Sequence, residues 1–195
     1  MLILPHDNLL PFIQEQLSGK TRIMRGYFLF NILLFISLAV LAYRDVQNGL
    51  LSWDDVLKSF GLGTLLVFTV LIVLHEAVHG VAYKMAGAPK VTYGVNWRKF
   101  YFYAVAHRFV AGRKAFTVVA LAPFVVISVL TILLSIFSPV ELKWVLFSVL
   151  FMHTGACAGD FAMMGFYEQH RHFADLLTFD DVERKISYFY VKENQ

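Results

Sequence analysis

Long apolar runs alternate with short polar connections along this chain, and the pattern predicts membrane-spanning helices. A helix needs roughly 20 apolar residues to cross the hydrocarbon core of a bilayer. The four runs of suitable length are residues 27–43, 62–86, 115–137 and 144–166. We therefore expect an all-α polytopic membrane protein with four transmembrane helices.

Two polar connections carry further helix signals. Within the N-terminal segment 1–26, the apolar residues between Leu9 and Leu17 recur at helical spacing, which predicts a cytoplasmic helix lying along the membrane surface. Ser52 is a suitable N-cap for a short amphipathic segment before the second apolar run. Gly61 and Gly63 then indicate a hinge between this segment and the membrane helix.

The remaining segments lie between the second and third helices and after the fourth. Residues 91–105 alternate around Asn96-Trp97-Arg98-Lys99, so we expect a short β-hairpin there. In the tail, residues 167–195, Thr178 with Asp181 is a pattern that caps a short helix. Ser187 to Val191 has strand-like residues, and otherwise we expect a partly ordered cytoplasmic terminus. The whole chain, residues 1–195, is read as a single integral membrane domain.

Composition agrees with the hydropathy pattern. The chain has 58% hydrophobic, 16% aromatic and only 16% charged residues, which is too apolar for an ordinary soluble domain. The net charge of +3 is spread over the connections, which suggests contacts with anionic lipid headgroups; no nucleic-acid-binding motif is found, and no nucleic acid partner is expected. The single cysteine, Cys157, excludes an intrachain disulfide framework.

Lysine and arginine residues predict the orientation of the chain. They are enriched before the first helix and between the second and third, and such segments face the cytoplasm. The other two connections are poorer in these residues, so both termini are predicted to be cytoplasmic. The residues concerned are Lys20, Arg22, Arg25, Lys84, Lys90, Arg98, Lys99, Arg108, Arg113 and Lys114.

The second apolar run contains the motif His75-Glu76-Ala77-Val78-His79. Residues four apart share one face of a helix, so both imidazoles point the same way with Glu76 beside them. Two histidines at this spacing, with the glutamate beside them, are the arrangement needed to hold a zinc ion and a water molecule, which indicates a hydrolytic site. Because ionisable groups are costly inside a bilayer and usually mark function there, we predict His75 and His79 as metal ligands and Glu76 as the catalytic residue.

Asp160, in the fourth run, lies at a matching depth. At a rise of 1.5 Å per residue, the centre of the histidine motif lies roughly 13 Å from the cytoplasmic end of its helix, and Asp160 lies roughly 9 Å from the same side. Gly155, Gly159 and the small residues between them let a neighbouring helix approach closely. We predict Asp160 as the third zinc ligand, which leaves the fourth position to water.

With this motif in a membrane helix, a basic and aromatic segment after it and a later helix with an aspartate, the chain resembles the small bacterial "putative zincin" membrane peptidases. It is more distantly similar to intramembrane zinc metalloproteases of the site-2-protease type, in which glycine typically follows the aspartate; here Phe161 does. The resemblance implies Zn²⁺ held by His75, His79 and Asp160, with Glu76 moving the proton of the attacking water. It also implies intramembrane proteolysis of membrane-associated or transmembrane substrates, near the cytoplasmic side of a bacterial cytoplasmic membrane.

Several alternatives remain open at this point. Cys157, one turn from Asp160, or the tail histidines His170 and His172 are other candidates to complete the metal site. His153 lies roughly 10 Å outward of Asp160 along the same helix and is more simply a packing residue. A metal-handling transporter or sensor would use other ligands as well; the set is His75, His79, His153, Cys157 and the nearby Met152, Met163 and Met164. A proteolytically inactive zinc-binding scaffold is the third reading.

Overall fold

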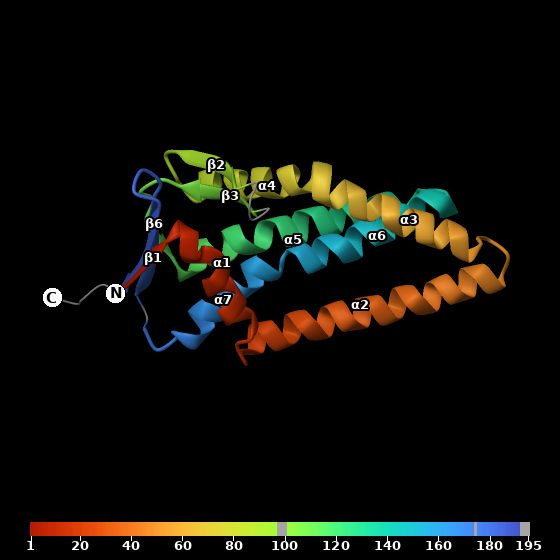
Figure 1. Ribbon diagram of the computed structural model, residues 1–195, viewed down its shortest axis with the longest axis horizontal. Helices are drawn as coiled ribbons and strands as arrows, with labels where there is room; N and C mark the ends of the chain where they lie inside the picture. Colours follow the sequence, from red (N-terminus) through yellow and green to blue (C-terminus); the bar gives the residue numbers. More distant parts are fainter. Residues whose placement is uncertain (97–100, 174, 192–195) are drawn as a thin grey trace.

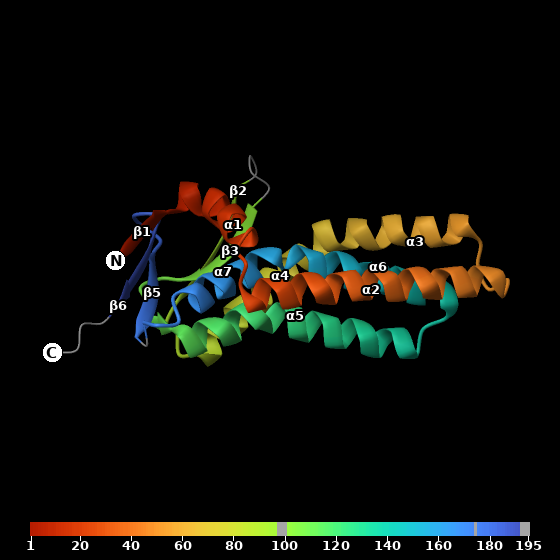
Figure 2. The same ribbon diagram turned by 90° about the horizontal axis from the view of Figure 1, so that it is seen from below.

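The computed structural model describes residues 1–96, 101–173 and 175–191. Long helices run side by side along the molecule, and the β-strands gather at one end of them (Figure 1). The N-terminus and strand β6, close to the C-terminus, lie at this same end (Figures 1 and 2). The helical part therefore crosses the length of the molecule an even number of times.

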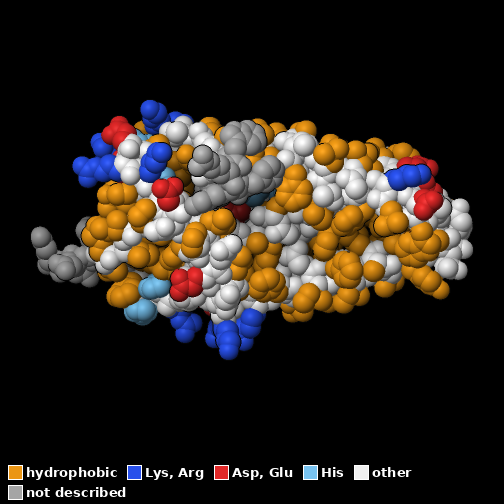
Figure 3. Space-filling model, viewed as in Figure 1, with side chains coloured by type: hydrophobic (Ala, Val, Ile, Leu, Met, Phe, Trp, Pro, Cys, Tyr) orange, Lys and Arg blue, Asp and Glu red, His pale blue; other side chains and the backbone are white. Residues whose placement is uncertain are grey.

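Four helical stretches in the described residues are long and apolar enough to cross a membrane. Their large apolar side chains face outward, as Leu65 and Leu134 do with 58% and 59% of their surface exposed, and Figure 3 shows such side chains spread over the helical half. The stretches are α2 (Arg22–Gln47), α3 (Trp53–Leu66) continued by the π-helical turn η2 (Val67–Leu71) and α4 (Ile72–Met85), α5 (Arg113–Ile136), and α6 (Val140–Ala156) followed by α7 (Ala158–Gln169).

Local sequence explains where these helices begin and end. The Thr21 side chain caps α2 by accepting a hydrogen bond from the backbone N–H of Met24. Ser52 and Asp55 form a reciprocal capping box at the start of α3, which confirms Ser52 as the N-cap. After α4 the chain turns at Gly87, whose φ of +96° suits a residue without a side chain.

The predicted hinge at Gly61 and Gly63 is wrong. Both glycines lie inside α3, which continues through the π-helical turn into α4 without a break. A Cβ on Gly63 would lie 2.5 Å from the Oγ of Ser148, so this glycine allows α3 to pack closely against α6. The amphipathic segment and the second membrane helix are one helical stretch.

The fourth stretch is interrupted, whereas the sequence predicted one continuous helix. Cys157 has a non-helical ψ of 3° and separates α6 from α7. A helix end leaves backbone carbonyls without helical partners, and here the Tyr27 hydroxyl of α2 donates to the carbonyls of Thr154 and Gly155, at 3.0 and 2.8 Å. The break redirects the chain just before Asp160.

The expected β-hairpin is confirmed. Strands β2 (Val91–Asn96) and β3 (Tyr101–Ala106) pair antiparallel, with Asn96 opposite Tyr101. The predicted turn residues Trp97, Arg98 and Lys99 lie outside the described residues. The hairpin packs along α4, beside the histidine motif (Figure 1).

The tail is ordered where it is described, which corrects two expectations. Thr178 and Asp181 do not cap a helix; both belong to a strand, and the N-terminal segment adds another strand to the same sheet. The antiparallel order is β1-β6-β5-β4, and helix α1 (Leu9–Leu17) packs on α7 beside it. The strands are β1 (Leu2–Pro5), β4 (Ala111–Gly112), β5 (Leu176–Asp181) and β6 (Ile186–Val191), with the 3-10 turn η1 (His6–Asn8) after β1.

Candidate metal centre and its cavity

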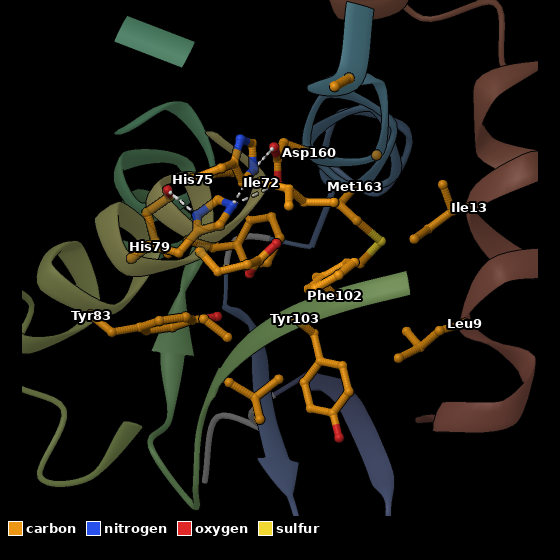
Figure 4. Close-up of a pocket in the computed structure, with 18 of the residues that line it drawn as sticks. Leu9, Ile13, Ile72, His75, His79, Tyr83, Phe102, Tyr103, Asp160 and Met163 are labelled. Carbon is orange, nitrogen blue, oxygen red and sulfur yellow. Dashed lines mark hydrogen bonds and ion pairs between the residues drawn. The ribbon is translucent and has the colours of Figure 1, made fainter. Parts of the chain in front are cut away.

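His75 and His79 project from the same face of α4, as their spacing requires. Their Nε2 atoms are 3.0 Å apart, and both side chains point toward Asp160 on α7 (Figure 4). The Oδ2 of Asp160 lies 3.3 Å from the Nε2 of His75, and the Oδ1 lies 3.2 Å from the Nε2 of His79. The structure therefore brings together all three residues that the sequence singled out as ligands.

These distances fit a zinc ion. With bonds of 2.0–2.2 Å in a tetrahedron, neighbouring ligand atoms lie about 3.3 Å apart. The described residues contain one group of two imidazoles and a carboxylate at this spacing, His75, His79 and Asp160. His79 is buried and the other two are half-buried, so the donor set also matches a partly enclosed catalytic site with one open position.

Pro123 on α5 explains how His79 is oriented. Proline has no backbone N–H, so the carbonyl four residues earlier, that of Val119, lacks its helical donor. The Nδ1 of His79 lies 2.9 Å from this carbonyl oxygen. A carbonyl can only accept, so Nδ1 carries the proton and Nε2 keeps its lone pair for a metal.

Glu76 lies on α4 between the two histidines and faces the hairpin. Glu76 and Ala104 of β3 line the same cavity. Glu76 lines both the central cavity and a shallower apolar groove between α4 and the hairpin. Glu76 therefore lies beside strand β3 as well as beside the two histidines.

The central cavity has a volume of about 440 Å³ and is mostly apolar. Figure 4 shows Leu9 and Ile13 of α1 across from the histidines, with Phe102 and Tyr103 of β3 between. Thr178, Asp180 and Ser187, from strands β5 and β6, add a polar part of the wall. Both chain ends thus help to enclose the candidate site, a contribution that no local sequence pattern indicated.

Two further residues lie beside the centre. His153 on α6 places its Nε2 3.2 Å from the Nδ1 of His75, and the Cys157 Sγ lies 3.8 Å from that same Nε2. His75, His153 and Cys157 form a second close group of ligand-type atoms. From the sequence, packing was the favoured role of His153; its i, i+7 spacing from Asp160 was the signal for its place near the centre.

The other histidines lie elsewhere. His170 bonds through its Nδ1 to the carbonyl of Phe166, 2.9 Å away, and its ring is tilted by 30° to that of His172, with the centroids 6.3 Å apart. The Nδ1 of His107 accepts from the backbone N–H of Val182 at 3.2 Å. Among the described residues, none of these three joins a close group of potential metal ligands, so the tail histidines do not complete the centre.

Comparison with known proteins agrees with the geometry. The profile of a family described as "putative zincin peptidase" matches residues 68–169, just over half of the chain. The chain belongs to this family. The match runs from the π-helical turn through the histidine motif and Asp160 to the end of α7, so the candidate metal centre lies wholly inside the zincin region. No curated protein and no solved structure matches the chain.

Proposed function

We propose that this protein is a zinc-dependent, membrane-embedded peptidase of the HExxH type. The convergence of His75, His79 and Asp160 beside Glu76, on the wall of a cavity that can admit a peptide, carries the proposal. Membership of a zincin family supports a zinc-dependent peptidase. Four helices able to cross a membrane support a location in the membrane.

His75, His79 and Asp160 would hold the metal. Zinc held there polarises a peptide carbonyl and lowers the pKa of a water molecule. Glu76 accepts the proton of that water and delivers it to the nitrogen of the leaving amine. Asp160 also balances charge: its carboxylate next to two imidazoles provides the negative charge that favours a cation in an apolar surrounding.

Strand β3 is suited to bind substrate. It pairs with β2, and residues Phe102 to Val105 of this strand line the cavity together with Glu76. An extended peptide in the cavity would lie against this strand and bind to it through backbone hydrogen bonds. A transmembrane substrate would first unwind locally, because a helix keeps its carbonyls in internal hydrogen bonds.

The candidate site, on α4 and α7, lies toward the end of the molecule that carries the sheets and the N-terminus (Figure 1). Lys and Arg side chains gather around this end on the face shown in Figure 3. By the positive-inside rule this end is cytoplasmic. The protein would then cut membrane-associated or transmembrane substrates near the cytoplasmic side of the bacterial cytoplasmic membrane, with its basic residues at anionic headgroups.

A metal-handling role is the second candidate, because His75, His153 and Cys157 form a further group of ligand-type atoms beside the first. Cys157 is fully buried. A transporter or sensor would depend on this group and would not need a general base. Glu76 therefore separates the two functions.

The deciding experiment compares the wild type with Glu76→Gln in liposomes that contain a library of membrane peptides. The proposal expects about one zinc per chain in both proteins and cleavage only by the wild type. Glu141→Gln, an exposed change in the first turn of α6, is the matched control and should keep both properties. Equal cleavage by Glu76→Gln and the wild type would contradict the proposed function.

A further inference from the structure

His153 contacts one metal-ligand histidine from the side away from the metal. It lies on α6 with only 2% of its surface exposed. Its Nε2 is 3.2 Å from the Nδ1 of His75, whose Nε2 faces Asp160. We propose that His153 is a positioning residue that holds His75 ready for zinc by accepting a hydrogen bond from its Nδ1–H. This inference rests on the zinc binding in the proposed function.

The protonation pattern of the pair follows from the geometry. If the Nε2 of His75 is to offer a lone pair to zinc, its Nδ1 must carry the proton. A metal-binding histidine usually donates this second N–H to an acceptor, which fixes the ring orientation. Among the described residues, the Nε2 of His153 is the one acceptor within hydrogen-bond distance of the His75 Nδ1.

The two ligand histidines are therefore held differently. His79 donates to the Val119 carbonyl, which can only accept and so permits one tautomer. His153 can donate or accept, and it accepts only when its own proton is on Nδ1. That Nδ1 is buried and has no hydrogen-bond partner in the described part of the chain. This tautomer leaves a buried N–H without a partner, which is unfavourable, so the hydrogen bond to His75 and the zinc binding that it supports must offset that cost.

Cys157 offers a matched control for packing. It is fully buried one helical turn from His153, and its Sγ lies 3.8 Å from the same Nε2. No hydrogen bond joins it to His75 among those described. A variant at Cys157 therefore disturbs the same region of the core and leaves the His75–His153 contact in place.

The experiment measures zinc affinity by chelator competition on the purified full-length protein, and the visible spectrum of its Co²⁺ form. His153→Leu removes the acceptor and should weaken zinc binding about 10- to 100-fold and alter the Co²⁺ spectrum. His153→Gln keeps an acceptor oxygen near the position of Nε2, so its affinity should return to within several-fold of wild type. Cys157→Ala should bind zinc as the wild type does.

Unchanged zinc affinity and Co²⁺ spectrum in His153→Leu would overturn the inference, and so would equal losses in His153→Leu and His153→Gln. An equal loss in Cys157→Ala would also overturn it, in favour of a metal site made by His153 and Cys157 themselves. If His153→Leu does not fold, the zinc affinities of His153→Gln and Cys157→Ala still test the inference. A wild type without zinc would instead defeat the proposed function, as would full cleavage by Glu76→Gln.

Discussion

Gly80, the residue after the histidine motif, provides a sharp test of how the hairpin is docked. A Cβ at this position would lie 1.8 Å from the Oη of Tyr93 and 2.6 Å from its Cζ. Carbon and oxygen atoms in ordinary contact stay about 3.5 Å apart, so in Gly80→Ala the ring must retreat by about 1.5–2 Å. Tyr93 lies on β2, so the hairpin must move with it or lose this contact.

Two opposing effects set the size and sign of the change. Glycine to alanine inside a helix is worth about 1 kcal/mol of stability, whereas overpacking costs about 1–3 kcal/mol. We expect Gly80→Ala to lower or barely change the free energy of unfolding in the wild type. In a Tyr93→Ala background the same substitution should raise it by about 1 kcal/mol. The difference between the backgrounds, about 1–3 kcal/mol, is the coupling that a double-mutant cycle measures.

The assay is reversible unfolding in detergent, with zinc content and peptide cleavage measured on the same samples. Gly61→Ala is the matched control, because nothing lies within 4 Å of a Cβ on that membrane-helix glycine. Gly80→Ala should keep its zinc and cut more slowly, since β3 shifts relative to Glu76. Equal stabilisation by Gly61→Ala and Gly80→Ala would refute the docking of Tyr93 over Gly80.

Two other substitutions test the surroundings of the centre. Pro123→Ala adds a backbone N–H that competes with His79 for the Val119 carbonyl, so we expect zinc affinity, measured by chelator competition, to fall about 10-fold. Thermal unfolding should show the protein stabilised by up to about 3 kcal/mol, because alanine suits the interior of α5 better than proline. Unchanged zinc affinity would mean that this carbonyl does not orient His79. Burial raises the pKa of the Asp180 carboxyl above its ordinary value of 3.8, so the folded state favours the protonated acid and loses stability as pH rises through that raised pKa. Asp180→Asn keeps an acceptor for the Ser187 hydroxyl and should remove this loss; parallel unfolding curves for variant and wild type from about pH 4 to about pH 8 would contradict the assignment.

Hydropathy and spacing predicted the parts of the site that depend on local geometry. The pair His75 and His79 follows from the helical repeat, and Asp160 follows from its depth in a later helix. How closely Asp160 approaches the histidines depends on the helix break at Cys157, and no proline or other helix-breaking residue predicts that break. Small residues such as Gly155 allow the helices to come close but do not predict where the helix ends. At the break, the Tyr27 hydroxyl of α2 donates hydrogen bonds to the carbonyls of Thr154 and Gly155, and this contact between distant segments has no local sequence signal.

The sheet at the end of the molecule could not be predicted in the same way. It joins β1 at the start of the chain to β6 near its end, with Leu2 opposite Phe189. Such pairing depends on contacts distant in sequence, which a local pattern of apolar residues does not encode. The helix-cap pattern at Thr178 and Asp181 was overridden by this pairing. The sequence indicates that Pro123 removes a helix hydrogen bond near the site, but the partner of the freed carbonyl, His79, lies on another helix and could not be predicted.

The most direct test of the account is the zinc content and peptide cleavage of three proteins prepared in parallel: the wild type, Glu76→Gln and Asp160→Asn. We predict about one zinc in the wild type and in Glu76→Gln, zinc binding weakened at least about 10-fold in Asp160→Asn, and cleavage by the wild type alone. Full zinc binding in Asp160→Asn would contradict its assignment as the third ligand. A wild type that binds no zinc, or a Glu76→Gln variant that cuts as fast as the wild type, would contradict the central claim.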